Sequence, residues 1–161
     1  MKPILNNKDL TLLLEISFSN QSNDKERDNS KKRLSGEIKE IGDNRDIFLH
    51  LKDGKPVAMV QLIYKNADND QELANGKDIA HIHDLEVRKD LHGRGFGKQC
   101  ILDLEEFAFG KGIKILTLGV DSTNLMAKGL YEKLGYQIFK EEEGRIPEEK
   151  LYLMKKTLLI K

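Results

Sequence analysis

The stretch VRKDLHGRGFGK occupies residues 87–98 and lies between a strand-like run and a helix-like run. Glycine occupies every second position from Gly93 to Gly97, so little side-chain bulk covers the backbone N–H groups there. A helix that begins directly after these glycines adds unpaired N–H donors and the positive end of its dipole. Arg94 and Lys98 add formal positive charge. The stretch therefore predicts a cradle for a phosphate or diphosphate group.

Two nucleotide-binding motifs do not fit this stretch. A P-loop requires Gly, four residues and then Gly-Lys-Ser/Thr, but His92 stands where the first Gly belongs and Gln99 where Ser/Thr belongs. A dinucleotide fingerprint would require a further glycine at Lys98. A glycine-rich turn that merely caps a helix remains the structural alternative.

Strand-like runs precede the loop. Ile47–Leu51 and Val57–Tyr64 flank the sequence Lys52-Asp53-Gly54-Lys55, and Asp-Gly is a strong hairpin signal. Ile79–Val87 follows as a third strand. Further upstream we expect a short edge strand at Lys2–Leu5 and a helix from Asp9 to Phe18.

The polar stretch Asn20–Lys32 is expected to be a mobile loop or a solvated helix end. A second helix is possible through Leu34, Ile38 and Ile41. After the glycine loop, apolar residues at helical spacing predict a helix that ends near Gly110 and Gly112, the usual C-cap residue.

The remaining pattern is a strand at Ile113–Val120, a helix at Asn124–Leu134, and strands at Tyr136–Lys140 and Leu151–Lys156 around an acidic connection. The whole order predicts an α/β fold. We expect a mixed, mostly antiparallel sheet of about six to seven strands with flanking helices and one right-handed parallel βαβ crossover.

A second motif follows the glycine loop: Asn124-x-x-Ala127-x-x-Leu130-Tyr131-x-x-x-Gly135-Tyr136. Together the two motifs resemble the GNAT superfamily of N-acetyltransferases, with signatures Arg/Gln-x-x-Gly-x-Gly/Ala and Asn-x-x-Ala-x-x-Leu/Phe-Tyr-x-x-x-Gly-Phe/Tyr. The resemblance covers about residues 45 to 156. It implies one GNAT-like acetyltransferase domain over residues 1–161. One departure is His92, which stands where the family usually has Gln or Arg.

The resemblance implies acetyl-CoA as co-substrate, no metal, and transfer of the acetyl group to a primary amine. Leu85 and Val87 would offer backbone groups to the pantetheine arm, and the loop amides would hold the pyrophosphate. Asn124 would contact the pantetheine arm or bound water. The full set implied for acetyl-CoA is Leu85, Val87, His92, Gly93, Arg94, Gly95, Phe96, Gly97, Lys98 and Asn124.

The resemblance also implies that Tyr131 donates a proton to the departing thiolate. A neutral phenol suits this role because its ordinary pKa of about 10 lies not far above that of a thiol. Tyr131 could instead be a core aromatic residue. Asn124 could be simply a helix N-cap, a role that Ser122 or Thr123 could share.

Direct attack on a thioester requires a neutral amine, so a general base is expected. In many relatives a Glu on the strand before the glycine loop has this role. His83 and then His81 are our candidates, because imidazole has a suitable unperturbed pKa. The alternatives are that both histidines only pack in the strand, or that a water chain removes the proton. A bulge near Leu85 would bring Glu86 into consideration.

Composition supplies limits of its own. The chain has 161 residues with 27 basic and 27 acidic side chains, so its net charge gives no reason to expect nucleic acid as a partner. Its one cysteine, Cys100, lies on an apolar helix stripe and is expected in the core. No apolar run is long enough for a membrane span. We expect a cytoplasmic monomer or homodimer without membrane association.

The leading functional hypothesis is an N-acetyltransferase that acts by direct attack in a ternary complex. The alternatives are an acetyl-CoA-binding regulatory or interaction module with little turnover and, less well supported, a nucleotide-phosphate-binding domain. The acceptor is a small-molecule amine or a protein amine. Glutamates at 141–143 and 148–149, in the connection expected between the last two strands, could attract a cationic acceptor but are more often solvated.

Overall fold

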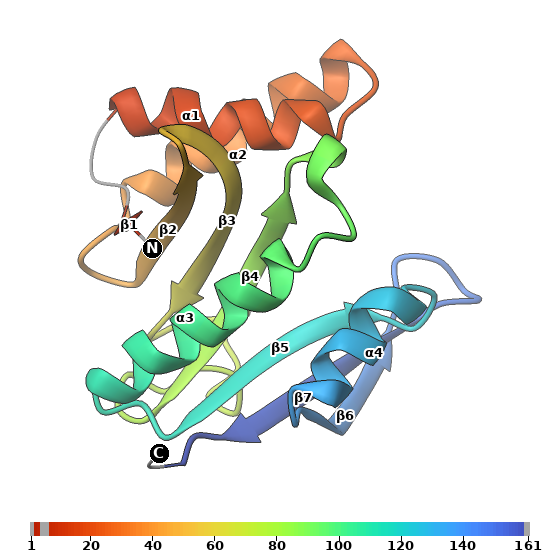
Figure 1. Cartoon of the computed structure of the whole chain (residues 1–161). Coiled ribbons are helices and arrows are strands. Elements are labelled where there is room, and N and C mark those ends of the chain that lie inside the picture. The colour runs from red at the N-terminus through yellow and green to blue at the C-terminus, as the bar shows by residue number, and fades with distance from the viewer. Residues whose placement is uncertain (1, 4–6, 160–161) are drawn as a thin grey trace. The chain divides into compact units, whose positions relative to one another are not determined.

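A computed structural model describes residues 2–3 and 7–159 of the chain (Figure 1). It forms two compact units, one within Met1–Ile63 and Asp84–Leu104 and the other within Tyr64–His83 and Glu105–Lys161. The helices are α1 (Asn7–Ser19), α2 (Asp24–Ile38), α3 (Phe96–Gly110) and α4 (Leu125–Lys133), with a short 3₁₀ helix η1 (Lys89–Leu91). The strands are β1 (Lys2–Pro3), β2 (Arg45–Lys52), β3 (Lys55–Ile63), β4 (Ile79–Val87), β5 (Ile115–Asp121), β6 (Gln137–Glu143) and β7 (Lys150–Thr157).

The first unit is built around the predicted hairpin of β2 and β3. Asp53 and Gly54 both have positive φ, at 53° and 75°, as a two-residue hairpin turn of this kind requires. β1 pairs with β2, which confirms an edge strand at Lys2–Pro3; the predicted continuation through Leu5 lies outside the described residues. The apolar faces of α1, α2 and the β2–β3 hairpin pack together in a core of Leu13, Ile16, Leu34, Ile47, Leu49 and Met59.

Of the two alternatives for Asn20–Lys32, the mobile loop is wrong and the solvated helix end is confirmed, because most of this stretch forms the largely exposed first part of α2. Asn23 caps the helix: its side chain accepts a hydrogen bond from the backbone N–H of Glu26 at 2.8 Å. Glu26 in turn accepts from the N–H of Ser22 at 3.1 Å. The Asn-x-x-Glu spacing is thus a capping arrangement that was readable in the sequence. The possible second helix is confirmed through Leu34 and Ile38, but it begins ten residues before Leu34 and ends before Ile41.

The second unit holds the parallel strand pair. β4 and β5 pair in parallel over Ile79–His81, with α3 between them in the chain. β5 pairs with β7 and β7 with β6, both antiparallel, and α4 lies beside β5 (Figure 1). Gly112 ends α3 at φ 89°, as predicted for its C-cap. Within residues 2–3 and 7–159 the strands number seven and are mostly antiparallel with one parallel pair of strands, which together with the flanking helices confirms the predicted mixed α/β class.

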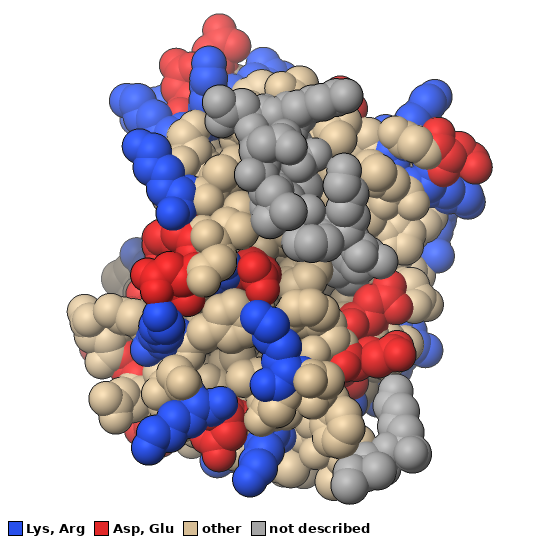
Figure 2. All heavy atoms as spheres, turned by 90° about the vertical axis from the view of Figure 1, so that its left-hand side faces the viewer, with Lys and Arg blue, Asp and Glu red and all other residues tan. Residues whose placement is uncertain are grey.

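The acidic connection is shorter than predicted. Glu141, Glu142 and Glu143 are not in a loop: they form the end of β6 and pair with Tyr152, Leu151 and Lys150 of β7. Cross-strand pairing therefore extends the strand into a charged sequence. On the face shown in Figure 2, basic and acidic side chains are interspersed. No helix among the described residues is both long and apolar enough to span a bilayer.

Candidate functional site

The glycine loop has the backbone conformation that its sequence predicts. Gly93 and Gly95 have φ of 76° and 85°, in the left-handed region where glycine alone is unstrained. A Cβ atom added at either position would have no heavy atom within 4 Å. These two glycines are therefore required by conformation and leave open space beside the backbone.

Gly97 differs from these two glycines. It lies in the first turn of α3 without a positive φ, and a Cβ atom there would be 3.7 Å from the side chains of Leu85 and Val87. A Cβ atom at this position would thus be in ordinary van der Waals contact with β4, so the packing of α3 on β4 does not require glycine. The amides of the first helical turn have no intrahelical acceptor, and no acidic residue lies in that turn. The N-terminus of α3 accordingly offers free donors and a positive dipole end to an anion.

His92 closes the loop onto β4. Its Nε2 donates to the carbonyl oxygen of Val87 at 2.8 Å, and Asn20 Nδ2 donates to the same oxygen at 3.0 Å. The carbonyl of Val87 is therefore already hydrogen-bonded twice within the protein. His92, the residue that departs from the family motif, is thus hydrogen-bonded to the end of β4, the strand that precedes the loop. Asn20 was missed because no local pattern links it to a residue 67 positions away.

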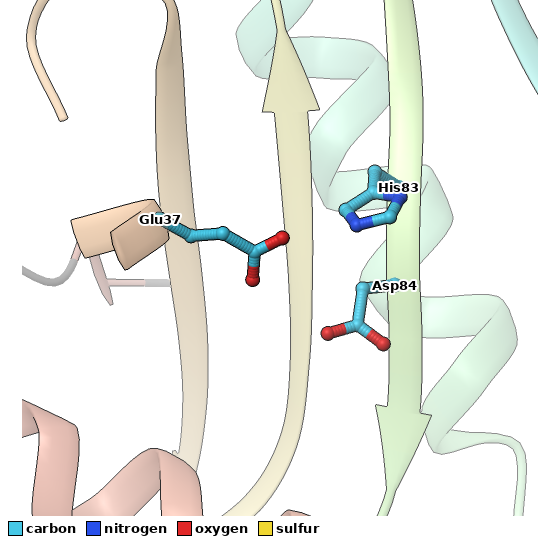
Figure 3. A group of neighbouring side chains, drawn as sticks. All are labelled: Glu37, His83 and Asp84. Carbon is cyan, nitrogen blue, oxygen red and sulfur yellow. The ribbon is translucent and has the colours of Figure 1, made fainter. Parts of the chain in front are cut away.

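β4 is irregular at Asp84, which has a φ of 56°. A left-handed residue interrupts the alternation of a strand, and it lies one residue before the position where a bulge was considered. The carboxylates of Asp84 and Glu37 point toward one another (Figure 3). Arg33 Nη1 donates to both, at 2.6 Å to Asp84 and 2.9 Å to Glu37. Arg33 of α2 thus bridges the two carboxylates with its single positive charge, and Arg45 Nη1 donates to the other carboxylate oxygen of Glu37 at 3.3 Å.

Glu86 also faces the N-terminal helices. Ser17 of α1, which is fully buried, donates to its carboxylate at 2.8 Å. Burial raises the pKa of Glu86, and the negative charge of Asp84 raises it further, while Ser17 and Arg33 act in the opposite direction. A carboxylate with a raised pKa is a stronger base than an ordinary one.

His81 is buried in the second unit and bonded to β5. Its Nδ1 lies 2.9 Å from Thr117 Oγ1, and that hydroxyl donates its proton to the carbonyl oxygen of Leu73 at 2.7 Å. Nδ1 must therefore be the donor, and Nε2 carries the lone pair. Burial and the nearby His83 lower the pKa of His81 to about 4. Burial thus makes His81 a weak base. His83, half-buried, follows on the same strand.

Tyr131 lies at the C-terminal end of α4 and is 8% exposed. Gly135, at φ 101°, ends the helix: its N–H donates to the Glu132 carbonyl, and the N–H of Tyr136 donates to the Tyr131 carbonyl at 2.9 Å. This pair of bonds is a Schellman motif, which brings the side chains of its two ends together. The rings of Tyr131 and Tyr136 meet edge to face, with centroids 5.9 Å apart. Burial raises the pKa of Tyr131 to about 12.

Asn124 is the N-cap of α4. Its side-chain oxygen accepts from the N–H of Ala127 at 3.2 Å, which confirms the capping alternative as its structural role. Its amide nitrogen can still donate. Cys100 is fully buried in α3, as predicted, and burial raises the pKa of its thiol to about 12.

The glycine loop thus places a helix N-terminus without acidic residues beside an irregular strand, an arrangement suited to an anionic group. Residues 8–136 match the family described as the acetyltransferase (GNAT) family. The chain belongs to this family.

Individual relatives agree with this assignment. The chain is 32% identical over 66 residues to an L-methionine sulfoximine/L-methionine sulfone acetyltransferase of Pseudomonas aeruginosa, covering 41% of this chain and 36% of that protein. It is 29% identical over 117 residues to a glucosamine 6-phosphate N-acetyltransferase of Trypanosoma brucei brucei, covering 68% and 75%. The match thus spans about a third of the first relative's length and three quarters of the second's. An aminoglycoside 6'-N-acetyltransferase solved with coenzyme A has the same fold, with a TM-score of 0.70, 15% identity and coverage of 100% and 99%.

Proposed function

We propose that the chain is an N-acetyltransferase that moves an acetyl group from acetyl-CoA to a primary amine by direct attack in a ternary complex. The observation that carries the proposal is the glycine loop, where two left-handed glycines with open space around them lead into a helix N-terminus without acidic residues. Membership of the GNAT family supports the same assignment.

The described residues fit coenzyme A as a ligand. The pyrophosphate accepts hydrogen bonds from the backbone amides of Arg94, Gly95, Gly97 and Lys98, and the exposed side chains of Arg94 and Lys98 add positive charge. The pantetheine arm pairs with the backbone of Leu85 and Val87. Acetyl-CoA supplies the activated acetyl thioester.

Tyr131 donates a hydrogen bond to the departing thiolate. With a pKa of about 12, the phenol stays protonated throughout the physiological range. A thiol has a pKa of about 8.5, so complete transfer of the phenolic proton would be uphill. Tyr131 therefore stabilises the thiolate mainly by donating a hydrogen bond. The sequence-based expectation of a nearly balanced proton transfer changes because burial raises the pKa of Tyr131.

The amine proton requires an acceptor. We keep His83 as the first candidate. Glu86 now precedes His81, because burial raises the pKa of Glu86 but lowers that of His81 to about 4. The acceptor itself is proposed only as a primary amine on a small molecule or a protein. An amino acid derivative, an amino sugar phosphate and an aminoglycoside appear in the names of the three compared proteins.

The experiment combines binding and turnover. Calorimetry with CoA and acetyl-CoA should show binding at one site. A thiol-release screen over amino acids, amino sugars, aminoglycosides, polyamines and peptides with free N-termini should then reveal the acceptor class. Tyr131→Phe should lower kcat by about 10²–10⁴-fold with unchanged affinity for CoA, and Tyr152→Phe serves as the matched control. Tight CoA binding without turnover over the whole panel would instead support a regulatory module.

A further inference from the structure

The second unit contains a buried polar cluster of Glu105, Tyr136 and Lys156, and Tyr136 contacts Tyr131. Glu105, on α3, is 5% exposed, and its two carboxylate oxygens have different partners. Oε2 accepts from the hydroxyl of Tyr136 at 2.9 Å, and Oε1 accepts from Lys156 Nζ at 2.8 Å. Every member of the cluster belongs to the second unit.

The side chain of Lys156 packs beside Gly135. A Cβ atom added at Gly135 would lie 3.5 Å from Lys156 Cε, which is ordinary van der Waals distance. The ammonium group lies 5.7 Å from the centroid of the Tyr136 ring while it pairs with Glu105. Tyr136 is thereby held at its hydroxyl by a carboxylate and at its face by a cation.

Tyr136 in turn contacts Tyr131 in two ways. Its backbone N–H donates to the Tyr131 carbonyl at 2.9 Å, and the two rings meet edge to face at an interplanar angle of 70°. The backbone bond fixes the two backbones relative to one another but does not set the χ angles of either ring. The hydroxyl bond to Glu105 adds a directional restraint on the buried ring of Tyr136, and the ring contact extends this restraint to Tyr131.

We propose that Glu105 is a positioning residue: through the hydroxyl of Tyr136 it holds the ring of Tyr131 in the orientation that serves the departing thiolate. This inference rests on the proposed role of Tyr131. Glu105 does not touch the substrate. Its carboxylate acts through Tyr136, and the ion pair with Lys156 holds that carboxylate in place.

The test compares Glu105→Gln with Glu106→Gln, an exposed neighbour on the same helix. Glu105→Gln should lower kcat about 10–100-fold with an unchanged KM for acetyl-CoA, because a misplaced catalytic group affects the chemical step. Tyr136→Phe, which removes only the hydroxyl, should have a similar effect. Glu106→Gln should match the wild type. Thermal unfolding must show that each variant is folded at the assay temperature.

A double-mutant cycle separates positioning from general destabilisation. In a Tyr131→Phe background, Glu105→Gln should cause no further loss of kcat, because the group that it positions is gone. Equal losses in both backgrounds would overturn the proposal.

A second readout does not depend on catalysis. The ring resonance of a labelled Tyr131 should shift or broaden in Glu105→Gln and Tyr136→Phe, and should stay unchanged in Glu106→Gln. An unchanged resonance in both of the first two variants would overturn the positioning role even if the enzyme is active. Full activity of Tyr131→Phe would instead refute the proposed role of Tyr131, whatever the resonance shows.

Discussion

The glycine loop and the interior of the second unit differ in what they expose: the loop exposes its backbone, and the interior buries titratable side chains. The loop, residues 92–98, exposes backbone: a Cβ atom added at Gly93 or Gly95 would have no heavy atom within 4 Å, and the neighbouring residues are largely exposed. The interior around Tyr131, Tyr136 and His81 does the reverse, because it buries titratable side chains and shifts their pKa values. The loop thus depends on backbone conformation, while the pKa values of the interior groups depend on packing.

The largest effect is expected in the loop, from Gly95→Val. A β-branched residue is strained at φ 85° and would cover the open backbone, so CoA binding should fall below detection by calorimetry. Gly97→Ala is the matched control. Its φ is ordinary and its Cβ would meet Leu85 and Val87 at van der Waals distance, so affinity should stay within about threefold. Equal losses in the two variants would remove the distinction between conformation and packing.

A smaller effect is expected in the interior of the second unit, where acid should lower the stability of the fold through His81. The folded-state pKa of His81 is about 4, below the unfolded value of about 6.5, so the unfolded chain binds this proton more readily. The stability that His81 contributes is therefore fully present above about pH 6.5 and is lost as the pH falls to about 4. The loss amounts to up to about 3 kcal/mol.

Denaturant unfolding at pH 7.5, 5.5 and 4.5 measures this contribution. The free energy of unfolding of His81→Gln should fall less steeply between these pH values than that of the wild type. His92→Gln, at an exposed histidine, should follow the wild-type slope. Parallel curves for all three proteins would show that the fold does not hold His81 neutral.

The smallest effect concerns the side chain that closes the loop. His92→Ala removes the Nε2 bond to the Val87 carbonyl, which is worth about 1 kcal/mol, so CoA affinity should weaken by about three- to tenfold. Gln can still donate a hydrogen bond, so His92→Gln should retain more of the affinity. A loss as large as that of Gly95→Val would mean that His92 contacts the coenzyme itself.

Local patterns in the sequence were enough for the loop and for most elements. Glycine spacing, the Asp53-Gly54 turn and helical periodicity act over a few residues, and the structure has each of them where predicted. The Tyr131–Tyr136 contact was also within reach, because Tyr-x-x-x-Gly-Tyr is the spacing of a Schellman motif. Two local signals were misread: the Asn23-x-x-Glu26 cap, and the extension of β6 through Glu143.

Long-range pairing set the limit of prediction. Nothing near Glu105 in the sequence indicates that it bonds to a tyrosine 31 residues later and a lysine 51 residues later. Arg33 and Asp84 are likewise 51 residues apart. The pKa of His81 depends on burial, which periodicity did not resolve for a strand interrupted at Asp84. Charged and titratable groups in the interior are where sequence patterns carry the least information.

The burial of Cys100 has a practical consequence for the assays above. The chain has a single cysteine, and its thiol, fully buried with a pKa of about 12, is almost entirely protonated at neutral pH. Disulfide reagents react with thiolates, so Cys100 of the folded protein should not react with them. Colour that develops with such a reagent during turnover would then report free coenzyme alone. Without substrate, the same reagent should measure the fraction of unfolded protein, because the Cys100 thiol is accessible only in unfolded molecules.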